Sequence, residues 1–177
     1  MLRKLFLIIG IIIIFQSCSK KDLVLEKNEI VDPYNSYKEG IQAFKENDYF
    51  FANKKFSEAE INFQNVDYAA KAALMSSYAL YGINFYTQAI ESLERYLKKY
   101  PGDKNVIYAH YLLAVIYFEQ ISDEKKDLEP LINAKNKIDF FLKKYPGSDY
   151  ALDLTFKNDL IQNQLAAKEL FIAKHYI

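Results

Sequence analysis

The segment Leu-Lys-Lys-Tyr-Pro-Gly occurs twice in the sequence, at residues 97–102 and at residues 142–147. Each copy closes an amphipathic segment and is followed by a polar residue and a further amphipathic segment. Tyr-Pro-Gly is a helix-stop signal, because proline disfavours the helical conformation of the residue before it and glycine is favoured just beyond a helix end. Six identical residues in a row are not expected by chance. The chain must therefore be built from repeated helical units.

Small and large apolar residues recur at matching places in three of these units. The small residues are Ala52, Ala89 and Ala134, and a large apolar residue follows each of them four positions later, namely Phe56, Leu93 and Ile138. Small residues let two antiparallel helices approach, while large residues fill the contact with the neighbouring helix. The alanines are 37 and 45 residues apart, near the tetratricopeptide period of about 34 residues. The wider second spacing predicts an insertion at residues 121–129.

The sequence predicts an all-α fold, because only five Gly and four Pro interrupt the 177 residues. Seven helices are expected, at residues 33–47, 49–63, 68–82, 86–100, 104–120, 131–145 and 149–176. The first six form three pairs, and the seventh begins a fourth unit. No pair can bury its apolar surface alone, so the pairs must stack as a tetratricopeptide-repeat solenoid with an extended concave face. We expect this domain to span residues 32–177, with Asp32 capping the first helix and Pro33 at its first position.

The first 17 residues have the organisation of a signal peptide. Arg3 and Lys4 precede an apolar run at residues 5–15, and Ser17 follows shortly after it. In helical form this run reaches roughly 16 Å at about 1.5 Å per residue, well short of the ~30 Å hydrocarbon core of a membrane. An exported chain is therefore favoured over a permanent transmembrane helix.

Cys18 is the only cysteine in the sequence, so an intramolecular disulfide is excluded. A small residue followed by Cys directly after an apolar run resembles the bacterial lipobox, in which the thiol is diacylated and becomes the mature N-terminus. Several acyl chains give stable membrane anchoring, and Ser19 after the cysteine favours the outer membrane by the sorting rules of such lipoproteins. Residues 18–31 then form a polar, flexible tether. The alternative is a chance cysteine in an ordinary signal peptide.

The sequence offers no pattern of a catalytic, cofactor or metal site. Its 23 basic and 23 acidic residues balance, so no basic excess indicates nucleic acid as a partner. Neither a histidine-based metal motif nor a glycine-rich phosphate loop is present, and we expect a structural or surface role for His110 and His175. We therefore predict a binding scaffold and not an enzyme.

In tetratricopeptide folds the first helix of each pair lines the concave face. That register gives seven candidate substrate-binding residues: Tyr37, Phe44, Lys45, Lys71, Tyr78, Tyr81 and Tyr108. Tyrosine suits peptide contacts because its ring offers contact area while its hydroxyl stays hydrogen-bonded in a wet groove. The same register places Leu74 and Leu112 on this face and Ser57 on the outer one. At each tyrosine the alternative is packing between helices.

Four segments carry a family resemblance: Tyr37-Lys38-Glu39-Gly40, Tyr78-Ala79-Leu80-Tyr81, Tyr-Pro-Gly-Ser-Asp-Tyr at residues 145–150, and above all residues 165–176. In these segments the sequence resembles the BamD family, the tetratricopeptide lipoproteins of the outer-membrane β-barrel assembly machinery. Residues 165–176 look like the start of the family's fourth repeat. Family members have five repeats, whereas this sequence reaches only the start of the fourth.

The resemblance implies a lipid-anchored protein on the periplasmic face of the outer membrane that helps insert and assemble outer-membrane proteins. It implies BamA, other lipoproteins of the machinery and unfolded outer-membrane proteins as partners. In the family, the three N-terminal repeats are associated with recognising the C-terminal signal of incoming outer-membrane proteins. The C-terminal repeats carry much of the contact with BamA.

Two other classes of protein stay open at this point. A different tetratricopeptide lipoprotein, such as a pilus-assembly pilotin or a cell-envelope coordination factor, would share the anchor and the repeats but not residues 165–176. An enzyme with an appended repeat domain would need a catalytic region that this chain has no length to hold.

Overall fold

The computed structural model describes residues 32–121 and 128–175. The predicted signal peptide, Cys18, the predicted tether and most of the predicted insertion at residues 121–129 lie outside the described residues. All described helices belong to one compact unit, Val31–Ile177.

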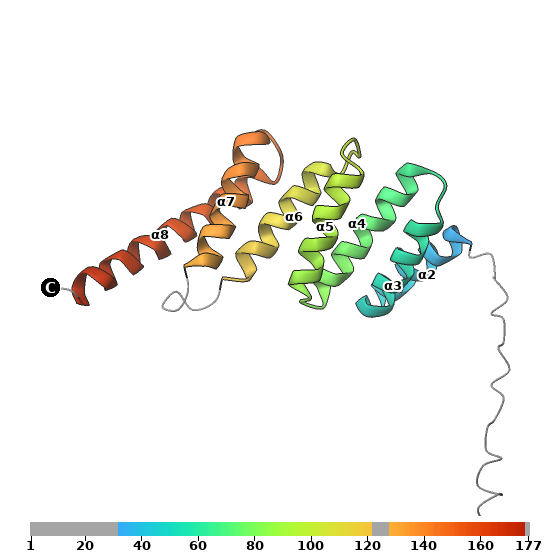
Figure 1. Ribbon diagram of the computed structural model, residues 1–177, viewed down its shortest axis with the longest axis horizontal. Coiled ribbons are helices and arrows are strands. Elements are labelled where there is room, and N and C mark those ends of the chain that lie inside the picture. Colours follow the sequence, from blue (N-terminus) through green and yellow to red (C-terminus); the bar gives the residue numbers. More distant parts are fainter. Residues whose placement is uncertain (1–31, 122–127, 176–177) are drawn as a thin grey trace, which may run out of the picture. The chain divides into compact units, whose positions relative to one another are not determined.

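The described part of the chain consists of seven helices and contains no strand. In chain order they are α2 (Pro33–Lys45), α3 (Tyr49–Asn62), α4 (Val66–Gly82), α5 (Tyr86–Lys99), α6 (Val106–Glu119), α7 (Glu129–Lys144) and α8 (Ala151–His175), as Figure 1 shows. All seven predicted helices are present, and each helix end lies within two residues of its predicted position. The all-α prediction is confirmed, with three helix pairs and α8 opening a fourth unit.

The helix ends follow from local sequence. Asp32 caps α2 as predicted, because its carboxylate accepts a hydrogen bond from the backbone amide of Tyr34 (3.0 Å) and Pro33 is the first helical residue. Asp48 and Asn65 cap α3 and α4 in the same way, each accepting from a backbone amide of the first helical turn.

Two of the turns between helices contain an asparagine in the same backbone conformation. Among the described residues other than glycine, only Asn47 and Asn84 have positive φ, at 62° and 59°, a region that asparagine tolerates better than most residues. Each asparagine side-chain oxygen also accepts a hydrogen bond from a tyrosine hydroxyl two residues later, from Tyr49 at 2.9 Å and from Tyr86 at 3.1 Å. The first two repeats therefore share the conformation of their turns as well as their helices.

Consecutive helices pack against each other, from α2 with α3 through α7 with α8, and α6 also contacts α8. Six residues predicted to lie in these contacts are fully buried: Ala52, Ala89, Ala134, Phe56, Leu93 and Ile138. A close approach occurs at Gly40 of α2, where a Cβ atom would lie 2.8 Å from the ring of Phe56. The predicted register of the core is confirmed.

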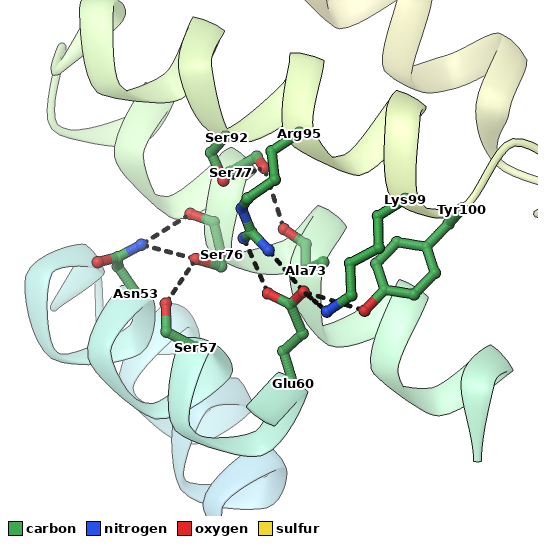
Figure 2. Close-up of polar contacts among 10 residues, drawn as sticks. All are labelled: Asn53, Ser57, Glu60, Ala73, Ser76, Ser77, Ser92, Arg95, Lys99 and Tyr100. Carbon is green, nitrogen blue, oxygen red and sulfur yellow. Dashed lines mark hydrogen bonds and ion pairs between the residues drawn. The ribbon is translucent and has the colours of Figure 1, made fainter. Parts of the chain in front are cut away.

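A buried carboxylate joins the second helices of the first two pairs (Figure 2). The Glu60 side chain on α3 is 3% exposed and accepts hydrogen bonds from both terminal nitrogens of Arg95 at 2.6 and 2.8 Å. It also accepts from Lys99 Nζ at 2.9 Å and from the Tyr100 hydroxyl at 3.0 Å. Burial alone would raise the pKa of Glu60, but these donors outweigh it and hold the pKa below its ordinary value of 4.5. We call these four residues the Glu60 clamp.

The prediction that Ser57 lies on the outer face is wrong. Its hydroxyl lies 2.9 Å from the hydroxyl of buried Ser76 on α4, and Asn53 donates to that same hydroxyl at 2.8 Å (Figure 2). Ser77, the next residue of α4, lies 2.8 Å from the Ser92 hydroxyl on α5. Serine is small enough for a close helix contact and finds its hydrogen bonds within that contact. A polar residue type therefore did not indicate an exposed position here.

Candidate functional site

Aromatic rings from the first helix of each pair form a continuous row. Phe44 of α2 stacks on Tyr78 of α4 with ring centroids 5.4 Å apart, and Tyr78 meets Tyr108 of α6 edge-on at 6.4 Å. Tyr108 lies 5.7 Å from Tyr150, which directly precedes α8. Two more rings extend the contacts, and the six residues that we call the aromatic row are Phe44, Tyr78, Tyr81, Tyr108, Tyr111 and Tyr150.

Carboxylates hold two hydroxyls of the row. Tyr81 donates to Glu119 at 2.7 Å, and Tyr111 donates to Asp153 at 3.0 Å. Burial raises the pKa of Tyr81, and the hydrogen bond to Glu119 raises it further. Burial, followed by the bond to Asp153, raises the pKa of Tyr111 to about 12. Both phenols therefore stay protonated at neutral pH, and their hydrogen bonds fix the orientation of the rings.

All rings of the row are partly buried and rest on the core clusters beneath them. The tyrosines of the row therefore do pack between helices, which was the alternative role expected for them, because their rings stack on one another and on the core. Each also keeps an accessible portion. A row that is already ordered can contact an apolar segment without first losing side-chain freedom, and this lowers the entropic cost of binding.

The structure separates the seven predicted site residues into groups. Phe44, Tyr78, Tyr81 and Tyr108 lie together in the aromatic row. Tyr37 lies outside it, against Phe56 with centroids 5.4 Å apart, and Lys71 Nζ lies 5.6 Å from the centre of the Tyr37 ring. Lys45 is exposed in the last turn of α2, directly after Phe44.

Comparison with known proteins identifies the family. A model of the outer membrane lipoprotein family YfiO matches residues 31–177. The chain belongs to this family. The outer membrane protein assembly factor BamD of Caulobacter vibrioides is 35% identical over 122 residues, which cover 69% of this chain and 40% of the relative. The protein of the same name from Rickettsia prowazekii is 31% identical over 173 residues, which cover 97% of this chain and 66% of the relative.

A third relative of that name, from Neisseria meningitidis serogroup A, is 22% identical over 189 residues, which cover 99% of this chain and 71% of the relative. This YfiO-family chain thus spans 40% to 66% of the length of the first two relatives. The resemblance to the BamD family seen in the sequence is confirmed.

The segments that carried this resemblance occupy different places in the YfiO-family fold. Tyr78 and Tyr81 belong to the aromatic row, as does Tyr150 at the end of the Tyr-Pro-Gly-Ser-Asp-Tyr segment. Gly40 makes the close contact with Phe56. Described residues of the 165–176 segment lie in the second half of α8, where Leu170 and Phe171 are exposed.

Two residues expected on the concave face are buried instead. Leu74 is 7% exposed and Leu112 is 3% exposed, and both belong to the core cluster that includes Leu93 and Tyr96 of α5. Because both side chains are buried in this cluster, they cannot contact a ligand on the row. A helix face predicted from spacing alone includes residues at the edge of that face. Aliphatic residues at the edge tend to be buried in the core.

Sequence reasoning missed Tyr111 and Tyr150 as members of the row and Glu119 and Asp153 as its hydrogen-bond acceptors. Tyr111 follows Tyr108 by three residues, a spacing that brings both side chains to one side of a helix. Spacing within a helix could therefore have found Tyr111. Tyr150, predicted inside the seventh helix, directly precedes α8 instead, so spacing within a helix could not bring it to Tyr108.

His110 packs between the rings of Phe140 and Tyr145, with centroids 5.1 and 5.7 Å away. Burial lowers the pKa of His110, and nearby Lys144 and Lys137 lower it further. In the described ranges, no three His, Cys, Asp or Glu side chains are grouped so that they could hold a metal ion. None of the helices in those ranges is both long and apolar enough to cross a membrane.

Proposed function

We propose that this chain is a subunit of the outer-membrane β-barrel assembly machinery that helps insert and assemble outer-membrane proteins, acting by binding and not by catalysis. Membership of the YfiO outer membrane lipoprotein family supports the proposal. Relatives that match nearly the whole chain are named outer membrane protein assembly factors. Family membership also favours this function over that of a pilus-assembly pilotin or a cell-envelope coordination factor.

The observation that carries the proposal is the aromatic row. Its successive rings from Phe44 to Tyr150 are 5.4 to 6.4 Å apart. In an extended peptide, alternate side chains lie on one side about 7 Å apart, so an unfolded strand of a barrel protein could place an aromatic side chain at each ring. Phe44, Tyr78, Tyr81 and Tyr108 would provide the apolar contacts. Tyr37 and a lysine, Lys45 or Lys71, would contact the end of the strand.

The test of substrate binding is a fluorescence-monitored titration of a labelled peptide that copies the C-terminal strand of a barrel protein. The full-length protein in mild detergent should bind it more tightly than a peptide of scrambled sequence. Tyr81→Ala should weaken binding roughly thirtyfold, because truncating a hot-spot aromatic costs about 2 kcal/mol. Tyr117→Ala is the matched control, since this ring on α6 lies outside the row and under Lys137. Equal binding of the two peptides would remove the substrate-receptor function.

The proposed location is the periplasmic face of the outer membrane, with Cys18 acylated after removal of residues 1–17, residues 18–31 as a tether and residues 32–177 as the repeat domain. Mass spectrometry of the membrane-bound protein should find a mature chain that begins at Cys18 and carries acyl mass. Cys18→Ala should leave a soluble protein or an uncleaved precursor. Retention of Met1 without acyl mass would contradict the anchor.

The proposed partners are BamA, other lipoproteins of the machinery and unfolded outer-membrane proteins. Co-purification from membranes solubilised in mild detergent tests them directly. BamA should be recovered with the tagged chain and absent from a parallel preparation of a tagged lipoprotein of unrelated fold. Recovery of pilus or cell-wall proteins in place of BamA would contradict this assignment of partners.

A further inference from the structure

Several lysines of the chain lie between a carboxylate and an aromatic ring. Four do so, namely Lys55, Lys99, Lys137 and Lys157. In each case the ammonium nitrogen is 2.7 to 3.1 Å from a carboxylate oxygen and 5.0 to 5.6 Å from the centre of a ring. A cation in such a place gains both an ion pair and the attraction of the ring face.

The carboxylate of Glu119 has aromatic rings beside it but no ammonium group. One of its oxygens lies 2.7 Å from the Tyr81 hydroxyl, and the other lies 3.3 Å from the Tyr86 hydroxyl. The Tyr86 hydroxyl is also 3.1 Å from the side-chain oxygen of Asn84, and it has only one hydrogen to donate. Glu119 is exposed, and within residues 32–121 and 128–175 it forms no ion pair with a basic side chain. Only neutral donors of those ranges therefore meet its charge.

Asp153, the other carboxylate that holds the aromatic row, has both kinds of partner. It accepts a hydrogen bond from the Tyr111 hydroxyl at 3.0 Å, as Glu119 does from Tyr81, and it also accepts from Lys157 Nζ at 2.7 Å. Lys157 in turn lies 5.5 Å from the centre of the Phe118 ring. The row thus has one carboxylate that a lysine of the same helix neutralises, and one that no described residue neutralises.

Two helix ends add negative potential around Glu119. Glu119 is the last residue of α6, and Tyr81 is the last but one of α4. The C-terminal end of a helix carries a partial negative charge, which a lysine in the last turn offsets. The last turns of α5 and α7 contain lysines, whereas those of α4 and α6 contain no basic residue. The carboxylate and the helix ends therefore both favour an added cation at this place.

We propose that Glu119, with the rings of Tyr81 and Tyr86, binds a lysine or arginine side chain of the segment that occupies the aromatic row. The inference rests on the proposed function and adds a specificity to it, because the row would favour an apolar segment that carries a positive charge. Tyr81 stacks on Tyr78 with centroids 5.9 Å apart, so the charge would lie beside the apolar contacts. Arginine suits the site best, since its planar guanidinium can both pair with a carboxylate through two hydrogen bonds and stack on a ring.

Matched pairs of labelled peptides test this inference. The two peptides of a pair share a run of alternating aromatic residues and differ at one position, which holds arginine in one and neutral citrulline in the other. One pair has this position before the aromatic run, and a second pair has it after the run. Full-length protein in mild detergent should bind the arginine peptide of at least one pair about fivefold more tightly, which corresponds to about 1 kcal/mol, the upper range for an exposed charge pair. Added salt should reduce this ratio.

Glu119→Gln should bring the ratio to about one, because glutamine keeps an acceptor for the Tyr81 hydroxyl but removes the charge. Glu119→Lys should reverse the preference. Glu46→Gln removes an exposed carboxylate directly after α2, and as the matched control it should keep the wild-type ratio.

Equal affinities within both pairs, with all peptides bound by the wild-type protein, would overturn the cation site and leave the proposed function standing. Failure of every peptide to bind a folded protein would overturn the proposed function as well. A preference that persists in Glu119→Gln, or that disappears in Glu46→Gln, would place the cation elsewhere and also overturn the inference.

Discussion

The first and second helices of the pairs are held together by different chemistry. Between the first helices α2, α4 and α6, aromatic rings make contacts from one helix to the next, among them the stacked and edge-on rings of the aromatic row. Between the second helices α3, α5 and α7, charged groups make the connection, through the Glu60 clamp and through an ion pair of Lys137 with Glu94 at 3.1 Å.

This difference separates binding from stability. Ring contacts tolerate a change of partner, because any aromatic or aliphatic group of similar size can take the place of a neighbouring ring. A buried carboxylate with four donors has no such tolerance, since losing one partner leaves a charged group without compensation. The second helices can therefore hold the spacing of the repeats while the first helices present a surface to other molecules.

The largest effect is expected where the clamp is broken. Glu60→Gln should lower the free energy of unfolding by about 3 kcal/mol, because hydrogen bonds to charged groups contribute about 1.5–3 kcal/mol each and the site is buried. Urea denaturation followed by circular dichroism measures it. Glu91→Gln, at an exposed position of α5, is the control and should change the stability little. An equal loss in the two variants would show that the clamp has no special role.

A somewhat smaller effect is expected when a ring of the aromatic row is removed, and it should appear in the binding affinity. Tyr78→Ala should weaken the affinity for the barrel-strand peptide by about 2 kcal/mol, whereas Glu60→Gln should leave the affinity of the folded fraction within about twofold of wild type. The titration described above measures both variants below their unfolding transitions. If Glu60→Gln reduced affinity as strongly as Tyr78→Ala, the division of roles between the helices would be wrong.

Glu60 of the clamp should lose its contribution to stability at low pH, and Tyr108 of the aromatic row should lose its contribution at high pH. Because the folded pKa of Glu60 lies below 4.5, the stability it contributes is present above that pH and is lost as the pH falls further. Burial raises the pKa of Tyr108 from 10.0 to about 12, so its contribution is present below pH 10.0 and is lost as the pH rises toward 12.

Stability measured across pH separates these contributions. Glu60→Gln should flatten the acid limb, and Tyr108→Phe should flatten the alkaline limb. An acid limb unchanged in Glu60→Gln, or an alkaline limb unchanged in Tyr108→Phe, would contradict the assignment.

The smallest effect is expected at the second charged contact. The side chains of Lys137 and Glu94 are 34% and 51% exposed, so water competes with the pair and the coupling should be about 0.3 kcal/mol. A double-mutant cycle with Glu94→Gln and Lys137→Gln isolates this coupling from the contact of Lys137 with Tyr117. A coupling above about 1 kcal/mol would contradict the expectation that solvent exposure makes this pair weaker than the Glu60 clamp.

Periodicity was enough to predict the helices and the core, because burial of Ala52, Phe56 and their counterparts follows directly from helix geometry. It also brought Phe44, Tyr78 and Tyr108 to one surface. It could not place Tyr150 or Glu60, because the partners of each residue lie in another helix pair. Ser57 and Leu74 were placed wrongly for a common reason. Both lie at the border between the buried and the exposed face of a helix, and there residue type and spacing do not determine whether a side chain packs against the neighbouring helix.

The Glu60 clamp also bears on how the chain folds. Chains of repeats make mostly local contacts, which lets them fold one unit at a time. Glu60 and Tyr100, however, are 40 positions apart, and the carboxylate is satisfied only when α3 and the end of α5 are both in place. A partly folded chain with the first pair alone would carry a carboxylate without its partners against a forming apolar core. The first two repeats should therefore form in a single cooperative step and resist opening one by one.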